Sequence, residues 1–349
     1  MARKPIEFEP DPDQAVRATP DLLGHAAAAG LLERAARSGR LAHAWVITGP
    51  PGIGKATLAY RFARWLLANG AEGGLPAGPA PLWLDPSHTS FRRVAAGAHA
   101  DLRVLRPEAG EGRVKREIRV DGVRAAIRFL AMTAAEGGWR ALLVDGAESM
   151  RGEAANALLK TLEEPPPRAV LLLTTPAPDR LLPTILSRVR RLDLSPLADA
   201  DVAALLAQHA PDLPAADRAR LAAIAEGSVG AALALAEGEG LAIQALVEEA
   251  LAGPPRARWH ALADAVAARR DGSGFVTFLA LLRRAVSAAV RGAARGGPAP
   301  AWLAARPLAE WSTLWDMLGR TGAETEALNL DRKQAVLAVL AALGGGRIG

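Results

Sequence analysis

The chain has 349 residues, 50% of them apolar, and 42 Lys and Arg against 37 Asp and Glu give a formal net charge of +5. This length favours two or three domains, and the absence of cysteine excludes disulfides and thiolate zinc sites. The positive excess is too small to identify a nucleic-acid partner, and no signal-peptide core or uncharged run of membrane-spanning length stands out, so we expect a cytoplasmic protein without a bound metal.

The first half of the chain alternates short apolar runs with helical patterns. Five segments are expected to be strands: 43–48, 101–107, 140–146, 169–175 and 190–196. Of these, 140–146 and 169–175 are continuous apolar runs of the kind typical of strands covered on both faces. Apolar residues with helical spacing occupy 25–42, 55–67, 120–134 and 153–164, the last ending at three prolines. This alternation predicts an α/β domain with a mostly parallel five-stranded sheet and helices on both faces.

Strand signals disappear after Pro196. Short helical segments run to about residue 243, and four or five longer helices follow, which we expect to be too charged to span a membrane and to pack on one another or on partner subunits. The predicted domains are therefore 1–196, 197–243 and 244–349. Within the first, Gly and Pro are dense over residues 70–100 and predict a surface excursion, and residues 1–20 predict a loosely held lead-in.

A phosphate-binding motif joins the first predicted strand to the helix that follows it. Residues 49–55 read GPPGIGK and fit the pattern G-x-x-x-x-G-K. Gly49, Gly52 and Gly54 let the backbone approach phosphate oxygens, the helix start adds partial positive charge, and Lys55 adds a full charge. A plain Gly-Pro turn is the alternative, and the lysine and the apolar stripe after it argue against that.

The metal ligands of a working site are altered. Catalytic loops place Ser or Thr after the lysine to bind Mg²⁺, but this chain has Ala56, and Thr57 is rotated by about 100° along the helix and does not simply replace it. Asp145 suits outer-sphere contact with a metal, but Gly146 stands where many such ATPases have a glutamate that activates water. We expect nucleotide contacts from the three glycines, Lys55, Thr57 and Asp145, and no metal-dependent hydrolysis.

Other polar residues leave alternatives open. Glu148 is more simply a solvated or helix-starting acid than a catalytic one. Thr174 and Thr175 end an apolar run, where they either face a γ-phosphate or satisfy the local backbone. The adjacent Glu163 and Glu164 point apart on a helix, which favours a solvated helix end over a catalytic pair. A basic stretch over 113–128 is interleaved with acids, which favours a solvated face over a DNA contact.

Arg188 follows Ser187 just before the last predicted strand. An arginine in that position can reach a phosphoryl group held by a neighbouring subunit, where its fixed charge and forked donors raise the rate by about 10³ to 10⁵ in known systems. From the pattern alone, a surface salt bridge is the simpler interpretation.

Taken together, these motifs resemble the clamp-loader branch of the AAA+ superfamily, and within it the delta-prime family of bacterial DNA polymerase III subunits. The segments that carry the resemblance are LLGH at 22–25, SGRLAHAWVITGPPGIGKATLAYRFARWLL at 38–67, LLVDGAESM at 142–150, NALLKTLEEPPP at 156–167 and LLPTILSR at 181–188. They are specific in combination, whereas no comparable motif marks the helical remainder.

The resemblance implies an AAA+ core, a small helical lid and an all-helical collar domain, within a hetero-pentameric ring that opens the sliding clamp and places it on primed DNA. The implied partners are gamma/tau motor subunits, the delta subunit, the clamp and, indirectly, the primed DNA. In that family delta-prime does not turn over ATP but offers the arginine of its Ser-Arg motif, here Ser187 and Arg188, to the adjacent motor subunit. Any ATP or ADP at its own site is then bound without hydrolysis.

Departures from the hydrolysing relatives agree with this interpretation. Besides Ala56 and Gly146, Gly230 stands where those relatives put a sensing arginine on the lid, and the four-cysteine zinc module that the family often carries is absent. The alternative is an active motor subunit that uses Lys55 and Asp145. A third class, a small-molecule P-loop kinase, lacks an evident acceptor pocket and catalytic base.

Overall fold

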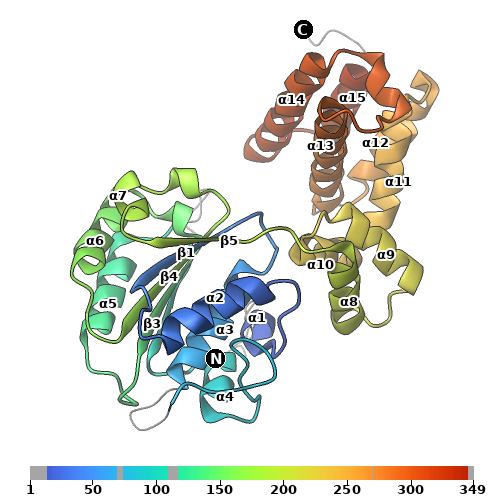
Figure 1. The fold of residues 1–349 in the computed structure, drawn as a ribbon. Coiled ribbons are helices and arrows are strands. Elements are labelled where there is room, and N and C mark those ends of the chain that lie inside the picture. Colours follow the sequence, from blue (N-terminus) through green and yellow to red (C-terminus); the bar gives the residue numbers. More distant parts are fainter. Residues whose placement is uncertain (1–13, 69–73, 109–116, 270, 345–349) are drawn as a thin grey trace, which may run out of the picture. The chain divides into compact units, whose positions relative to one another are not determined.

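The computed structural model describes residues 14–68, 74–108, 117–269 and 271–344, in two compact units, Met1–Ala232 and Leu233–Gly349 (Figure 1). The boundary between the units falls within a helix of the segment that we predicted as a separate small domain, 197–243. The predicted division into three domains, with boundaries at 196 and 243, stays a prediction.

All five predicted strands form, and they build one parallel sheet in the order β2-β3-β4-β1-β5. The strands are β1 (Ala44–Thr48), β2 (Leu102–Leu105), β3 (Arg140–Asp145), β4 (Ala169–Thr175) and β5 (Arg190–Asp193). Every residue of β1 and β4 is buried, as the continuous apolar runs predict for central strands. The sequence-based fold class is confirmed.

Helices cover both faces of the sheet because successive strand side chains point to opposite sides. Trp45 and Ile47 belong to one buried cluster, and Ala44 and Val46 to the other. The helices on the first side are α2 (Ala26–Arg37), α3 (Lys55–Leu67) and α4 (Thr89–Ala95), and those on the second are α5 (Val120–Ala131), α6 (Gly152–Glu163) and α7 (Pro183–Leu186) (Figure 1). Helix α5 ends three residues earlier than the apolar period to Ala134 suggested.

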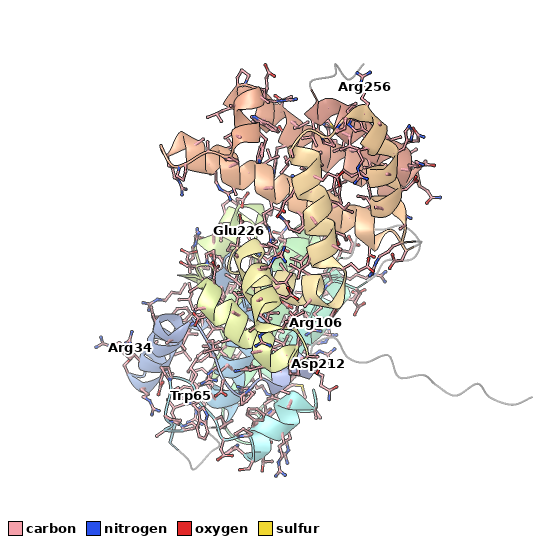
Figure 2. The ribbon with its side chains drawn as sticks, turned by 90° about the vertical axis from the view of Figure 1, so that its right-hand side faces the viewer. Arg34, Trp65, Arg106, Asp212, Glu226 and Arg256 are labelled. Carbon is pink, nitrogen blue, oxygen red and sulfur yellow. The ribbon has the colours of Figure 1, made fainter. Side chains whose placement is uncertain are left out.

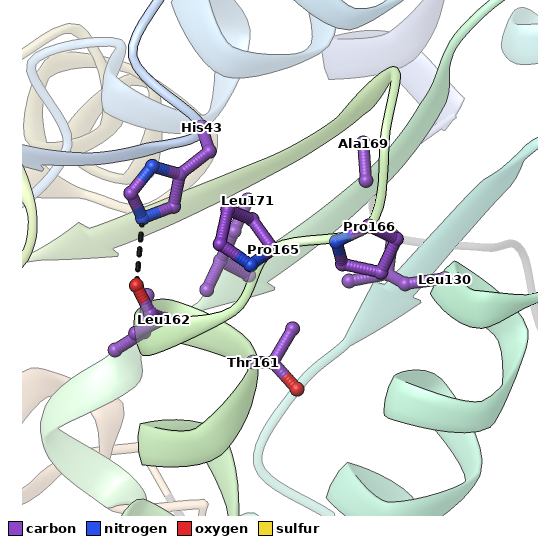
Figure 3. A pocket seen from close by; sticks show the side chains of 8 residues that line it. All are labelled: His43, Leu130, Thr161, Leu162, Pro165, Pro166, Ala169 and Leu171. Atoms are coloured by element: carbon purple, nitrogen blue, oxygen red, sulfur yellow. Dashed lines mark hydrogen bonds between the residues drawn. The ribbon is translucent and has the colours of Figure 1, made fainter.

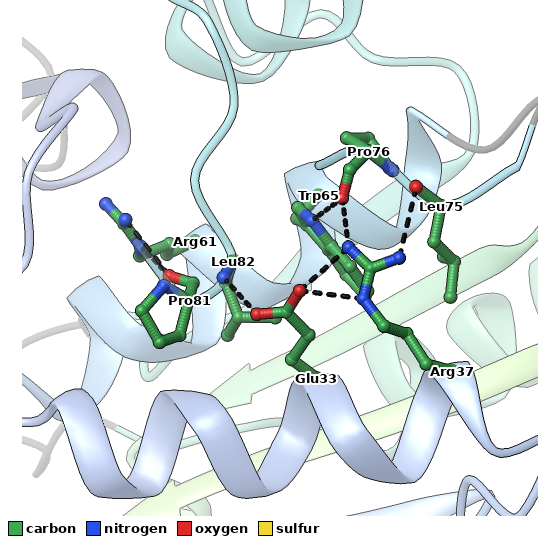
Figure 4. Close-up of polar contacts among 8 residues, drawn as sticks. All are labelled: Glu33, Arg37, Arg61, Trp65, Leu75, Pro76, Pro81 and Leu82. Atoms are coloured by element: carbon green, nitrogen blue, oxygen red, sulfur yellow. Dashed lines mark hydrogen bonds and ion pairs between the residues drawn. The ribbon is translucent and has the colours of Figure 1, made fainter. Parts of the chain in front are cut away.

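The predicted surface excursion, 70–100, is only partly right: residues 70–73 lie outside the described part, and residues 74–100 are not all at the surface. Leu82 and Val94 are fully buried, the second within α4. Side chains of α2 and α3 bind the backbone of residues 75–82, as Figure 4 shows. Arg37 donates to the carbonyls of Leu75 and Pro76, the Trp65 indole donates to Pro76 O at 3.1 Å, Arg61 donates to Pro81 O at 3.2 Å, and Glu33 accepts from Leu82 N at 3.1 Å.

Two buried arginines of α3 also bind the segment before α2. Arg64 donates to Arg17 O at 3.0 Å and to Thr19 O at 2.6 Å, and Arg61 donates to Pro20 O. Burial lowers the pKa of Arg64 to about 9, so this side chain is still a charged donor at neutral pH. The expectation of a loosely held lead-in is wrong for residues 14–20, where α1 (Gln14–Ala18) forms; residues 1–13 lie outside the described part.

The rest of the chain is helical, as predicted. After the short 3-10 turns Ala147–Ser149 and Pro178–Arg180 and strand β5 come α8 (Asp199–His209), α9 (Ala215–Ile224), α10 (Val229–Glu237), α11 (Gly240–Leu251), α12 (Arg256–Ala267), α13 (Ser273–Ala294), a 3-10 turn (Ala301–Ala305), α14 (Leu308–Ala327) and α15 (Arg332–Leu343). Within the second unit α13 packs on α11, α12 and α14.

Helix α13 is the one unbroken helix in the described residues that is long and apolar enough to cross a membrane, with a mean hydropathy of 1.4 in its most apolar window. We expected the charges of these helices to exclude membrane spanning, but the length and composition of α13 do not exclude it. The helix nevertheless buries Phe275, Phe278 and Leu282 against its neighbours, and a core helix of a bundle has the same composition.

Candidate functional site

The phosphate-binding loop has the backbone that its glycines predict. Gly49, Gly52 and Gly54 have φ of 139°, 72° and 101°, values that favour glycine. The loop leaves β1 and ends at Lys55, the first residue of α3. His25, buried at the start of α2, supports it: because Ile53 O can only accept, His25 Nε2 donates to it at 2.7 Å.

Lys55 binds the loop itself. Its Nζ donates to Gly49 O at 2.8 Å and to Pro50 O at 2.6 Å, and the residue is only 8% exposed. Burial lowers the pKa of the Lys55 amine, and the nearby carboxylates of Asp145 and Glu148 oppose that shift. The lysine thus lies among two loop carbonyls and two acids, and a phosphate would have to compete for it.

Asp145 ends β3 at the carboxyl edge of the sheet, opposite Thr174 of β4. One oxygen of Asp145, Oδ1, accepts from Thr174 Oγ1 at 2.5 Å. The other, Oδ2, lies 4.0 Å from Nε of Arg106, the residue after β2. Thr175 Oγ1 accepts from Ala177 N at 3.0 Å, so Thr175 satisfies the local backbone, which was one of the two alternatives for this residue. Thr174 instead binds the side chain of Asp145.

These residues do not fit a catalytic Mg²⁺ site. Ala56 offers no oxygen, and both oxygens of Asp145 already face partners within the protein. Gly146 is left-handed, with φ of 75°, and a Cβ there would lie 3.2 Å from Pro107 Cγ, so a glutamate at this position would be strained. The backbone conformation at residue 146 thus favours glycine over the glutamate that we expect in hydrolysing relatives.

The start of α10 lies on the phosphate-binding loop. Ser228 Oγ donates to Pro51 O at 2.9 Å and Gly230 N donates to Gly52 O at 2.9 Å. A Cβ on Gly230 would lie 3.1 Å from Gly52 Cα, so any side chain at this position requires the two backbone segments to move slightly apart. The close approach of the two backbone segments gives a structural reason for glycine at position 230. This contact could not be predicted from the sequence.

We expect Gly230→Ala to lower the free energy of unfolding by about 1–3 kcal/mol, because two backbone segments must separate. Gly152→Ala in α6 is the control: a Cβ there meets nothing within 4 Å, and alanine favours a helix, so its stability should not fall. Urea unfolding followed by tryptophan fluorescence measures both. Equal stability of the two variants would contradict the close contact.

Arg188 is held at the surface beside the end of α6. Its Nη2 lies 2.7 Å from Glu163 Oε1, and its Nη1 donates to Thr184 O at 3.0 Å and to Ser187 Oγ at 3.2 Å. The side chains of Arg188 and Glu163 are 36% and 51% exposed. The prediction of a merely solvated Glu163 missed this ion pair, because α7 and α6 meet only in the fold.

The end of α6 is itself fixed to the sheet. His43, next to β1, donates from Nε2 to Leu162 O at 2.9 Å, beside a cavity of about 10 Å³ that is lined by Pro165 and Pro166 among others (Figure 3). A cavity of that size is about the smallest that holds one water. Leu162 precedes Glu163, so this contact places the carboxylate that binds Arg188.

The structure brings together most of the predicted site. Gly49, Gly52, Gly54, Lys55 and Asp145 lie at one edge of the sheet, and Thr57 lies on the first turn of α3, partly exposed. Ser187 and Arg188 lie apart from them, at the end of α7.

Sequence reasoning missed four contributors to the site: His25, Arg106, Glu163 and Ser228. Only Arg106 had a usable signal, because it follows a predicted strand at the edge where Asp145 also lies. Of the predicted basic stretch, residues 113, 115 and 116 lie outside the described part, whereas Arg124 lies 3.7 Å from Asp121, in line with a solvated face.

Comparison with known proteins identifies related chains. The family model described as DNA polymerase III, delta subunit, matches residues 24–198. DNA polymerase III subunit delta' of Pseudomonas aeruginosa is 42% identical over 188 residues, which are 54% of this chain and 53% of that protein. Its Escherichia coli counterpart is 34% identical over 66% of this chain and 65% of its own length. The chain thus spans between half and two thirds of these relatives.

Two further similarities concern the fold and the alternative that the chain is a motor subunit. DNA polymerase III subunit tau of Escherichia coli is 30% identical over 57% of this chain and 29% of its own length. The crystal structure of a DNA polymerase III gamma subunit-related protein from Thermotoga maritima covers 91% of this chain and 98% of its own, with 21% identity and a TM-score of 0.51. At that identity the likeness shows the fold alone.

Proposed function

Because this chain belongs to the DNA polymerase III delta subunit family, with delta-prime subunits among its relatives, we propose that it is a non-hydrolysing clamp-loader subunit that donates Arg188 to a neighbouring ATPase. The observation that carries the proposal is the contrast between two sites. Arg188 is presented at the surface with both of its terminal nitrogens, Nη1 and Nη2, held by contacts, whereas the chain's own phosphate-binding loop lacks a set of metal ligands.

The geometry supports a role in trans. Arg188 lies in the turn after α7, and among the described residues no phosphate site lies beside it, since Lys55 and Asp145 occupy the carboxyl edge of the sheet. Its only ionic partner that the structure gives is Glu163, an exposed pair of the kind that contributes about 0–1 kcal/mol. Such a pair holds the side chain in place and is weak enough to exchange for a phosphoryl group of an adjoining subunit.

The proposed partners are those that the family implies: gamma/tau motor subunits, the delta subunit and the sliding clamp, in a hetero-pentamer that places the clamp on primed DNA in the cytoplasm. ATP or ADP at the chain's own loop, if it displaces the carbonyls from Lys55, is bound without hydrolysis. The rival function is an active motor subunit, which the similarity to tau and the retained Lys55 and Asp145 favour.

An assay on the isolated chain separates these functions. We expect its release of phosphate from ATP with Mg²⁺ to equal that of Lys55→Ala, because neither Ala56 nor Gly146 supplies what hydrolysis needs. The lysine variant also corrects for contaminating ATPases, which do not depend on Lys55. Turnover that Lys55→Ala abolishes would establish the motor function instead.

A further inference from the structure

The positively charged side chain of Arg106 lies between the end of β3 and helix α3, at the edge of the phosphate-binding loop. Arg106 follows β2, whose last residue pairs with Val144, so Arg106 comes level with Asp145 on the neighbouring strand. Its Nε lies 4.0 Å from Asp145 Oδ2 and its Nη2 donates to Tyr60 OH at 2.8 Å. Figure 2 labels Arg106 among the side chains of the chain.

Asp145 and Tyr60, which Arg106 contacts, mark the place where other P-loop sites hold a metal. A catalytic site holds Mg²⁺ between the hydroxyl after the lysine and an acid at the carboxyl end of another strand of the sheet. Here those positions are Ala56 and Asp145, and Tyr60 lies one helical turn after Ala56 on the same face of α3. The guanidinium therefore reaches from the acid toward the side of α3 that would have supplied the hydroxyl.

The four charged side chains named so far, all in the part of the chain that the structure describes, balance one another. Asp145 and Glu148 supply two negative charges, and Lys55 and Arg106 supply two positive charges. The side chains of Arg106 and Asp145 are 28% and 31% exposed, so their attraction is less screened than that of a fully exposed pair. A divalent cation entering beside Asp145 would be repelled by the guanidinium and would find one acid already compensated.

We propose that Arg106 is a built-in cation that replaces the divalent ion of this site, so that Asp145 does not bind Mg²⁺ or Mn²⁺ in this chain. The proposal concerns the chain's own site and does not depend on the role of Arg188. It gives Asp145 a function that does not involve a metal: together with Thr174 and Tyr60, it holds the ends of β3, β4 and β2 and the first turns of α3 in one arrangement.

Manganese binding tests this directly, because free Mn²⁺ is counted by electron paramagnetic resonance without nucleotide or ATPase activity. We expect titrations of the full chain and of Asp145→Asn with MnCl₂ to superimpose. We expect Arg106→Gln, which removes the charge and keeps a polar side chain with an amide donor, to bind one Mn²⁺ at least tenfold more tightly than the unaltered chain. This gain should disappear in the double variant Arg106→Gln, Asp145→Asn.

Arg103→Ala is the matched control, since Arg103 is an exposed arginine of the same strand, and its titration should equal that of the unaltered chain. Binding by the unaltered chain that Asp145→Asn abolishes would overturn the proposal. A folded Arg106→Gln without tighter Mn²⁺ binding would also overturn it. Should Arg106→Gln not fold, the comparison between the unaltered chain and Asp145→Asn still decides whether Asp145 is a metal ligand.

Discussion

Replacing Arg188 by alanine should lower ATP hydrolysis at the site that this chain adjoins by about 10³- to 10⁵-fold, because a guanidinium that stabilises the transferring phosphoryl group has that effect in related systems. Folding and assembly should be unchanged, since the side chain is 36% exposed and its one ion pair is exposed as well. The measurement is single-turnover hydrolysis by the clamp loader reconstituted with its own motor subunits.

Two further variants distinguish a finger from a structural ion pair. Arg188→Lys keeps the charge but loses the fork of donors, so it should remain strongly impaired. Glu163→Gln breaks the same ion pair while leaving the guanidinium, so turnover should stay within about threefold, which corresponds to the small value of an exposed pair. Equal losses in Glu163→Gln and Arg188→Ala would mean that the pair, and not the arginine, matters.

Replacing Trp65 by alanine should lower the free energy of unfolding by about 3–5 kcal/mol, the cost of emptying a large buried site. Trp65 is 1% exposed, its ring centroid lies 6.4 Å from that of Phe62, and Arg37 lies over it at 5.3 Å. The indole also binds Pro76 O, so the backbone of residues 74–84 should lose protection from hydrogen exchange (Figure 4).

Trp65→Phe separates packing from the hydrogen bond: it fills most of the volume and removes one of the two donors to Pro76 O, the other being Arg37, so we expect a loss of about 0.5–1.5 kcal/mol. Met132→Ala, at a residue that is 64% exposed, should change stability by less than about 0.5 kcal/mol. Denaturant unfolding and hydrogen exchange measure these effects. Normal protection of residues 74–84 in Trp65→Ala would show that the indole does not organise them.

The fold could be predicted because its signals are local. The central strands β1, β3 and β4 are short, largely apolar runs, the covering helices have apolar stripes of their own, and all five predicted strands formed one parallel sheet. Residues 74–100 could not be predicted in the same way, since Gly and Pro show only that the chain turns. What binds this segment comes from Glu33, Arg37, Arg61 and Trp65, which lie on other elements.

The phosphate-binding loop and the loss of its metal ligands were also readable from sequence, because both depend on residue type at fixed spacing along one segment. The neighbours of those residues were not, because the carboxyl ends of separate strands meet only when the sheet forms. Arg106 reached Asp145 in this way. Glu163 reached Arg188, and Gly230 reached the loop, because helices that are separate in the chain pack against other elements. The sequence by itself thus determined the fold class, the phosphate-binding loop over residues 49–55 and the absence of a hydroxyl at Ala56. Only the tertiary structure decided which charges face one another, because contacts between residues far apart in the chain are specified by packing and not by spacing.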